Sequence, residues 1–591
     1  MKRLLLAFLL VAWAIGPRAH AQLRVAPVDL DQGHIALGLA LRHLGNTGIF
    51  MMATAHPDDE NNGLLVMLNR GQGYRTTLAT ATRGNGGQNE IGPELSEALG
   101  VLRTEELHAI HRFDGAEQYF TRAVDFGYSF SIDETYEKWG RDEIIGDYVR
   151  LICTIRPDVM TALTPTGSGG GQHHQASALL AREAYRAAGD PRRYPEQIAE
   201  GLHPWRPRKF YFAANVGDGR RAGASAVGQL TVNIGGYDSL LGRTWSEVGA
   251  EARSMHKCQG TDQLLRLPGP ASATYTLAES SVGSLSATES TLFDGVDTSI
   301  GGLAQLAAPL APAELTAGLE AIATAIQTAQ TRFSTETDGA TVAPLLSGLR
   351  ATKALRAALA GMTLSEGSRF DLDARLAQKE REFEHALVIA SRVRIEVLAD
   401  DQVVVPGQSV RVTVLVANRG DQDLAVKRVS FEGLEGTATC AFTAVTAGRG
   451  PGAAPAPAPA EALASVPPGV AGQCAPALTI PLATRVTEPY WHRAGEAGRY
   501  SFDTDAPFGL PYRPTPFRAT LAVSIGGSDE VKVQLPVQAR YQGDVFSGEK
   551  RGDLLVVPPV SVSVSPSIAI ISRPRVRSTP SAPVDNERQI R

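Results

Sequence analysis

The sequence predicts an α/β domain, followed by a helical segment and a C-terminal immunoglobulin-like β-sandwich. Between residues 48 and 260, short apolar runs alternate with helical patterns, which is typical of an open α/β sheet. Apolar residues then recur at helical spacing from 312 to 389, and we expect three helices there. From residue 393 onward they occupy alternate positions, as in the half-buried strands of a sandwich. A chain of 591 residues is long enough for several such domains.

The first 21 residues have the layout of a secretory signal peptide. Two basic residues precede an apolar stretch at 4–15, and an Ala-x-Ala sequence ends at Ala21. We therefore expect export, with a periplasmic or extracellular location after cleavage. No later stretch approaches the roughly 20 apolar residues that a membrane helix requires, so we expect no membrane span in the mature protein.

The charge balance is acidic. The chain has 57 Lys and Arg residues against 62 Asp and Glu residues, a formal net charge of −5. Cleavage of the signal peptide would remove basic residues and make the charge more negative. Nucleic-acid binding calls for a basic face, so we expect no nucleic-acid partner.

A polar cluster follows the first predicted strand. The apolar run 49–55 does not alternate, as expected of a central parallel strand, and it leads directly into His56-Pro57-Asp58-Asp59-Glu60. Ligands of open α/β sheets bind at the carboxyl ends of the strands. His56 and Asp59 could hold one divalent metal ion and leave Asp58 free as a general base. The alternative interpretation is a polar turn that only caps the next helix.

A second histidine pair follows another apolar segment at 158–163. A glycine-rich loop leads to His173 and His174, and a helical pattern runs from 176 to 188. Such a loop can approach a ligand closely, so either histidine could complete the coordination sphere. The alternative is that both are solvated. The repeated order of strand, histidine and helix favours the metal site.

Six segments in chain order resemble the motifs of one family. They are residues 55–60, 82–89, 103–107, 125–127, 174–176 and 256–259. The family is the LmbE-like or PIG-L-type N-acetylglucosaminyl deacetylases, which are metal-dependent amidohydrolases with a Rossmann-like, three-layer fold. The resemblance implies that His56, Asp59 and His174 bind one Zn²⁺ per chain. It also implies that Asp58 is the general base.

The same resemblance assigns the substrate side of the site. Arg103 and Asp125 match positions that hold the sugar. Relatives carry a further histidine three positions before the second metal histidine, which supports the oxyanion, and Gly171 stands there. Either His256 or His173 then takes that role, or the enzyme is slower than its relatives. We expect His256, which we place on a rigid helix, rather than His173, which we place in the glycine-rich loop and which could equally face solvent.

Composition sets the expected domain boundaries. They are a signal peptide at 1–21, the deacetylase-like domain at 22–310, the helical segment at 311–390, the β-sandwich at 391–555, and a partial extra strand with a disordered tail at 556–591. Within the first domain we expect a lead-in helix at 34–44 and later strands at 209–213 and 229–234. Residues 261–309 are rich in Ser, Thr and Gly, and we expect an irregular excursion there.

The four cysteines fit an exported protein. Cys440 and Cys474 flank an Ala- and Pro-rich loop at 450–464, and a disulfide there would limit the entropy of that loop. We therefore expect this bridge. We expect Cys153 and Cys258 to be free, buried thiols.

Together these features predict a secreted zinc-dependent deacetylase that hydrolyses the N-acetyl amide of an amino sugar or glycoconjugate. Zinc would polarise the acetyl carbonyl and lower the pKa of its water, and Asp58 would accept the proton. His256 or His173 would support the oxyanion. Two alternatives stay open. One is a non-catalytic glycan-binding protein, in which a free base would have no use, and the other is a zinc hydrolase of a different amide.

Overall fold

The computed structural model describes residues 31–166, 171–214, 228–260, 265, 267–283, 289–437, 440–445, 462–542 and 549–562. Residues 22–557 form one compact unit, and all elements below belong to it. The predicted signal peptide lies outside the described residues. So do most of the Ala- and Pro-rich loop and the tail beyond residue 562.

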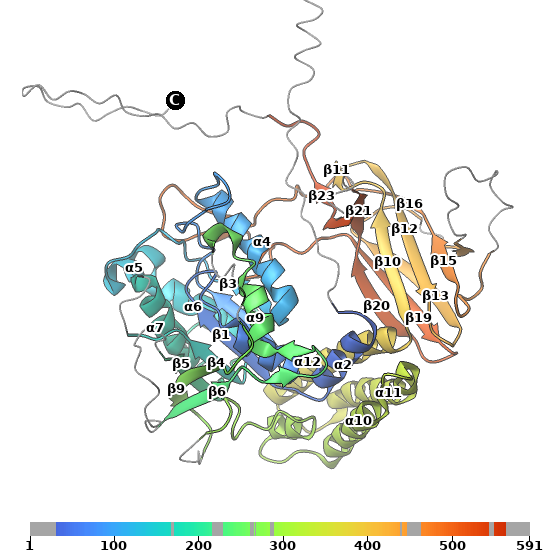
Figure 1. Cartoon of the computed structure of the whole chain (residues 1–591), viewed down its shortest axis with the longest axis horizontal. Helices are drawn as coiled ribbons and strands as arrows, with labels where there is room; N and C mark the ends of the chain where they lie inside the picture. Colours follow the sequence, from blue (N-terminus) through green and yellow to red (C-terminus); the bar gives the residue numbers. More distant parts are fainter. Residues whose placement is uncertain are drawn as a thin grey trace, which may run out of the picture. The chain divides into compact units, whose positions relative to one another are not determined.

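A seven-stranded sheet forms the centre of the first domain, in the order β3-β2-β1-β4-β5-β9-β6 (Figure 1). Its parallel strands are β1 (Ile49–Thr54), β2 (Arg75–Thr80), β3 (Glu117–Phe120), β4 (Val159–Ala162) and β5 (Lys209–Ala213), and β9 (Ser272–Ser280) and β6 (Gln229–Asn233) complete it with antiparallel pairings. The chain runs outward from β1 to β3 and then returns to the other side of β1 as β4. The strand order therefore reverses between β1 and β4, which is where such sheets bind ligands.

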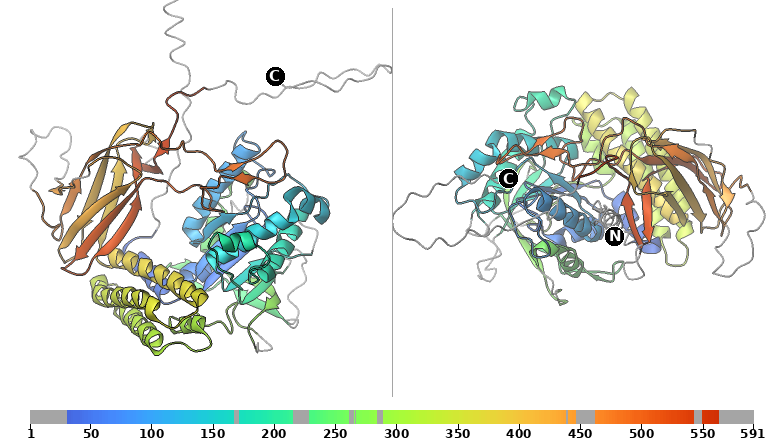
Figure 2. Two further views of the ribbon diagram at one scale, coloured as in Figure 1. Left: turned by 180° about the vertical axis from the view of Figure 1, so that it is seen from behind. Right: turned by 90° about the horizontal axis from the view of Figure 1, so that it is seen from above.

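Helices cover both faces of this sheet, as the three-layer prediction requires (Figure 2). Along β1, Ile49, Met51 and Ala53 join one core, and Phe50 and Met52 join the other. The first core contains residues of α6 (Arg141–Ile155) and α7 (Gln172–Ala187), and the second contains residues of α3 (Asn62–Val66), α4 (Glu97–Asp114) and α9 (Trp245–Arg253). A strand buried on both faces explains why this run shows no alternation in the sequence. The α/β prediction is confirmed.

Shorter elements complete the first domain. They are η1 (Met67–Gly71), α5 (Ile132–Trp139), α8 (Pro195–Ala199), β7 (Tyr237–Asp238), β8 (Arg243–Thr244), η2 (Lys257–Gln259) and η3 (Gly301–Ala307). The expectation of an irregular excursion at 261–309 is wrong, because β9 lies between β5 and β6 in the sheet. Its Thr, Ser and Ala residues concealed the strand, although Tyr275 is buried in the core.

The helical segment contains the three helices that were expected. They are α10 (Ala313–Arg332), α11 (Val342–Ala358) and α12 (Glu366–Ala390), with the short helices η4 (Asp338–Thr341) and η5 (Leu359–Gly361). The predicted lead-in helix is α2 (Gly33–Leu44), which packs against α12. Its Leu37, Leu41 and Leu44 join one apolar core with leucines of all three helices.

The remaining strands form a β-rich module with two main sheets. The larger sheet contains β14 (Thr443–Ala444), β15 (Ala471–Cys474), β12 (Ser409–Asn418), β10 (Val393–Ala399), β21 (Gln538–Gln542) and β22 (Glu549–Asp553), with β16 (Ala477–Thr479) beside β12. The smaller sheet contains β13 (Leu424–Glu432), β19 (Arg518–Ile525) and β20 (Val531–Pro536), and two further pairs are β11 (Val403–Val404) with β23 (Leu555–Val556) and β17 (Trp491–His492) with β18 (Ser501–Phe502). Alternate residues of β12 and β19 share one core. The assignment to the immunoglobulin class stays a prediction.

The cysteine predictions are confirmed. Cys440 and Cys474 form a disulfide, and Cys153 and Cys258 are free and buried. Among the helices of the described residues, none has the length and apolar character needed to cross a membrane.

Candidate metal centre

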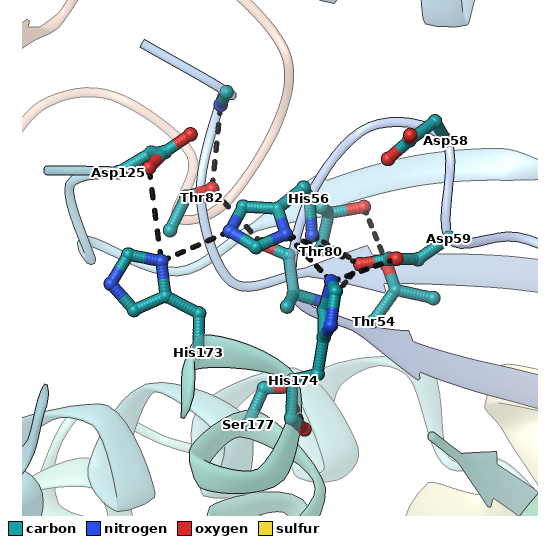
Figure 3. Close-up of polar contacts among 12 residues, drawn as sticks. Thr54, His56, Asp58, Asp59, Thr80, Thr82, Asp125, His173, His174 and Ser177 are labelled. Atoms are coloured by element: carbon teal, nitrogen blue, oxygen red, sulfur yellow. Dashed lines mark hydrogen bonds and ion pairs between the residues drawn. The ribbon is translucent and has the colours of Figure 1, made fainter. Parts of the chain in front are cut away.

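The predicted metal ligands meet at the carboxyl ends of β1 and β4 (Figure 3). The Nδ1 atom of His56 lies 3.1 Å from Nε2 of His174 and 3.5 Å from Oδ2 of Asp59. The Nε2 atom of His174 lies 3.1 Å from Oδ1 of Asp59. His56 follows β1, and His174 lies in the first turn of α7, which follows β4. The reversal of strand order therefore brings together residues separated by more than a hundred positions.

This donor set suits a catalytic zinc ion. Such sites use three nitrogen or oxygen ligands and keep one position open for water. The ligand atoms of His56, Asp59 and His174 all lie within 4.8 Å of one another. Burial alone would raise the pKa of the Asp59 carboxyl, but hydrogen bonds with His174 and His56 outweigh burial and lower that pKa. Asp59 is therefore held in the anionic form that a metal ligand requires.

Asp58 lies to one side of this cluster in a strained conformation (Figure 3). Its φ of +114° is in a region that L-residues rarely adopt, and such strain persists only where surrounding contacts impose it. The backbone N–H of Asp58 donates to Glu60 Oε2 at 2.9 Å, and its carbonyl accepts from Arg253. Its carboxylate Oδ2 accepts from Gln259 Nε2 at 2.6 Å. Asp58 is thus fixed apart from the three ligand side chains.

The surroundings of Asp58 also change its acidity. Burial, followed by the nearby charges of Asp59 and Glu60, raises the pKa of Asp58 to about 6. A general base functions best when its pKa lies near the working pH. Sequence reasoning missed Arg253 and Gln259 as contacts of Asp58, although Gln259 belongs to the late motif at 256–259.

The expectation that His256 lies on a rigid helix and faces the metal site is wrong. Helix α9 ends at Arg253, and His256 precedes the short helix η2. The side chain is fully buried, and its Nε2 lies 2.6 Å from Oε1 of Glu60. Burial would raise the pKa of Glu60, but the charge of His256 and its hydrogen bond lower it to about 2. His256 therefore affects Asp58 indirectly, because it pairs with Glu60, whose carboxylate accepts from the backbone N–H of Asp58.

The expectation that His173 lies in the glycine-rich loop is also wrong, and its side chain does not face solvent. His173 belongs to α7 and is 1% exposed, with its ring packed against those of Phe126 and Trp139. Its Nδ1 lies 3.0 Å from Nε2 of His56 and 3.7 Å from Oδ1 of Asp125. Burial, followed by the nearby charge of His56, lowers the pKa of His173 to about 3. His173 is thus a neutral partner for His56.

Two further predicted positions have clear backbone roles. Gly171 immediately precedes α7 with φ +79° and ψ −178°, a conformation essentially restricted to glycine. Arg103 on α4 is buried, and its guanidinium donates to the backbone carbonyl of Gln88 at 2.8 Å. In this structure Arg103 supports the loop at 84–88, and its predicted contact with a sugar stays a prediction.

The fold and the site together define an α/β domain whose side chains could hold a metal ion at the carboxyl ends of its central strands. The family model described as PIG-L: GlcNAc-PI de-N-acetylase matches residues 51–185, which contain His56, Asp58, Asp59 and His174. The chain therefore contains a PIG-L-type, or LmbE-like, domain, and the resemblance seen in the sequence is confirmed.

Several curated proteins are similar to this chain. A 1D-myo-inositol 2-acetamido-2-deoxy-alpha-D-glucopyranoside deacetylase from Streptomyces avermitilis is 29% identical over 179 residues, which cover 27% of this chain and 60% of that protein. The protein of the same name from Thermobispora bispora is 29% identical, over 29% of this chain and 61% of that protein. The chain thus spans about 60% of the length of these relatives.

Solved structures show weaker likeness. An N,N'-diacetylchitobiose deacetylase from Pyrococcus horikoshii is 17% identical, with a TM-score of 0.28 over 36% of this chain and 71% of that one. A conserved protein from Thermus thermophilus is 18% identical, with a TM-score of 0.23 over 36% of this chain and 79% of that one.

Proposed function

We propose that this protein is a zinc-dependent deacetylase that hydrolyses the N-acetyl amide of an amino sugar or glycoconjugate. The observation that carries the proposal is the separation of roles at the end of β1. His56, Asp59 and His174 form a metal-ligand set, and Asp58 is held beside them with a raised pKa. A site that only bound a glycan would have no use for such a base.

In this proposal His56, Asp59 and His174 hold the zinc ion. When bound, zinc polarises the acetyl carbonyl and lowers the pKa of water. Gln259 donates to Oδ2 of Asp58, which leaves the other carboxylate oxygen to accept a proton from the attacking water. Asp58 can then act as the general acid that returns the proton to the leaving amine. The amide C–N bond breaks, and the products are acetate and an amine.

The substrate class rests on the relatives. The names of the curated proteins describe deacetylases that act on an acetamido sugar attached to inositol. The matched family is described as a GlcNAc-PI de-N-acetylase. An N-acetylated amino sugar is the part that these substrates share. Residues 1–21 support export, and we propose that the enzyme acts outside the cytoplasm.

The experiment is acetate release from a panel of N-acetylated sugars by zinc-loaded protein. We expect acetate from at least one substrate with a free N-acetylglucosaminyl unit, and release about 10² to 10⁴ times slower from the Asp58→Asn protein. Zinc-loaded protein that binds these sugars but releases no acetate would favour a glycan-binding protein. Activity confined to acylated amino acids would favour a hydrolase of another amide.

A further inference from the structure

A segment of the β-rich module contributes directly to the α/β domain. Residues 490–512 leave the module between β16 and β19 and contain β17 and β18. We call this segment the strap. Its backbone hydrogen bonds to the α/β domain are Phe120 N to Gly509 O at 2.7 Å, Val124 N to Gly498 O at 2.9 Å, and Tyr500 N to Arg122 O at 2.7 Å. Tyr490, Trp491 and Tyr500 share a separate apolar core with Val124.

These bonds meet the sheet at the carboxyl end of its edge strand β3, which β2 separates from β1. Strand β3 is an end strand, so one of its sides lacks a neighbouring strand in the sheet. The strap pairs with the last residue of β3, Phe120, and with the chain that continues to Asp125. An edge strand has unpaired backbone N–H and C=O groups, and proteins commonly protect such an edge with another segment of the chain. The strap forms hydrogen bonds with these groups at Phe120 and along the following loop, which carries Asp125.

The strap also surrounds Arg83, whose guanidinium is buried. Within the described residues, Arg83 forms no ion pair with a carboxylate. Instead its guanidinium stacks 3.4 Å from the ring centroid of Trp491 and 4.1 Å from that of Phe120. It donates to the carbonyls of Pro511 at 3.0 Å and Leu510 at 3.3 Å. A buried charge is costly without compensation, and most of the groups that compensate this one come from the strap.

Arg83 lies near the start of the loop at 82–89. This loop lies against both predicted substrate residues, Arg103 and Asp125. The next residue but one after Arg83, Asn85, donates to the hydroxyl of Tyr500 at 2.5 Å. Between them, a Cβ on Gly84 would lie 2.7 Å from Cδ of Arg103 and 3.2 Å from Cδ of Pro57. The loop thus packs between Arg103 and the turn that carries Asp58, and the strap holds it on both sides of Gly84.

We propose that the strap is a positioning element of the active site, which orders the loops at 82–89 and 120–127 for substrate binding. The two loops touch, because a Cβ on Gly86 would lie 2.7 Å from Oδ1 of Asp125. Loops that are ordered before binding reduce the entropic cost of binding the substrate. Arg83, Trp491 and Tyr500 act through these loops and do not themselves touch the reacting atoms. The substrate role of the loops rests on the proposed function.

The first test compares two equivalent changes in the strap. Tyr500→Phe removes one hydroxyl that contacts the loop at Asn85. Tyr512→Phe removes one hydroxyl that contacts the backbone carbonyl of Val101 on α4, at 3.0 Å, and serves as the matched control. A protein whose competent state is less populated binds more weakly in proportion. We expect Tyr500→Phe to raise KM about three- to tenfold, which corresponds to the free energy of one hydrogen bond. We expect kcat to stay nearly unchanged.

The second test needs no substrate. Hydrogen exchange of the metal-loaded protein should become faster at 82–89 and 120–127 in Tyr500→Phe than in Tyr512→Phe. This measurement separates the two proposals, because it can succeed even if the wild type releases no acetate from any sugar. Equal exchange at these loops in the two variants, with equal KM values, would overturn the role of the strap.

A third comparison distinguishes a local effect on the loop at 82–89 from a general loss of folding. Trp491→Phe keeps an aromatic ring over Arg83, whereas Trp491→Leu removes it. We expect Trp491→Leu to speed exchange at 82–89, and Trp491→Phe to restore most of the protection. If both variants keep wild-type protection, Arg83 is not held by the strap and the proposal is wrong.

Discussion

The Nε2 atom of His56 lies 3.0 Å from Nδ1 of His173, on the side of the imidazole opposite to His174 and Asp59. Histidines that bind a metal commonly donate their other ring N–H to an acceptor, which fixes the tautomer and the ring orientation. A neutral His173 can accept that proton at Nδ1. The geometry therefore gives His173 a role in orienting His56 and leaves the Nδ1 atom of His56 for the metal.

The first prediction follows from this pair. His173→Ala should weaken zinc binding about 10- to 100-fold, as the loss of such a supporting partner does. His174→Ala, which removes a ligand itself, should abolish stoichiometric binding. Competition with a chelator of known affinity measures both effects. His173→Asn, whose amide can still face His56, is the control and should recover part of the affinity. Unchanged affinity in His173→Ala would contradict the orienting role.

The second prediction concerns the base. Asp58→Asn keeps the size of the side chain and removes the proton acceptor, so turnover should fall by about 10² to 10⁴. Zinc content should stay near one ion per chain, because Asp58 is not among the three ligand residues. Metal analysis and steady-state kinetics on the same sample test this separation of roles. Loss of zinc together with activity would instead make Asp58 a ligand.

The third prediction replaces the expected oxyanion role of His256. Both His256 and Glu60 have fully buried side chains, and removal of one partner leaves the other without its contact. His256→Ala should destabilise the fold by about 3 to 5 kcal/mol, as for other broken buried pairs. Turnover should fall as well, because Glu60 holds the strained backbone of Asp58. Chemical denaturation measures the first effect, and a large loss of turnover at unchanged stability would restore the oxyanion role.

The fourth prediction concerns Gly171, where relatives carry a histidine. Gly171→His would introduce the residue of the relatives but would force a side chain into a backbone conformation that costs about 1 to 3 kcal/mol. A Cβ there would also lie 3.4 Å from the carbonyl oxygen of Ser129. We expect lower stability without a gain in turnover. Gly171→Ala is the control for backbone strain alone, and a turnover above that of the wild type in Gly171→His would contradict this expectation.

The sequence was sufficient to predict the elements that carry the metal ligands. Strand β1 is buried on both faces, so its apolar run is clear in the sequence, and the motif at 55–60 follows it directly. Strand β9 was missed because its Thr, Ser and Ala residues do not form the apolar pattern of a core strand. Its place between β5 and β6 depends on tertiary pairing.

The roles of individual histidines could not be predicted in the same way. Adjacent residues of a helix point in different directions, and the sequence does not state which ring nitrogen faces which partner. His256 was placed by the family resemblance, and His173 by the glycine-rich sequence before it. His256 instead lies outside α9 and pairs with the buried Glu60, and His173 lies within α7. Contacts of Arg83 with Trp491 and Pro511 were beyond sequence reasoning, because no local pattern links segments so far apart in the chain.

The strap also has a consequence for the order in which the parts of the candidate site can form along the chain. Arg83 and Pro511 are separated by 428 positions, so the ribosome must complete most of the chain before their hydrogen bond can form. Translation at roughly 5 to 20 residues per second allows the N-terminal domain to begin folding well before that point. An early domain would have its metal ligands but an incomplete substrate side. Chains that end before the strap would therefore bind substrate more weakly than the full-length protein, in line with the positioning role proposed for the strap.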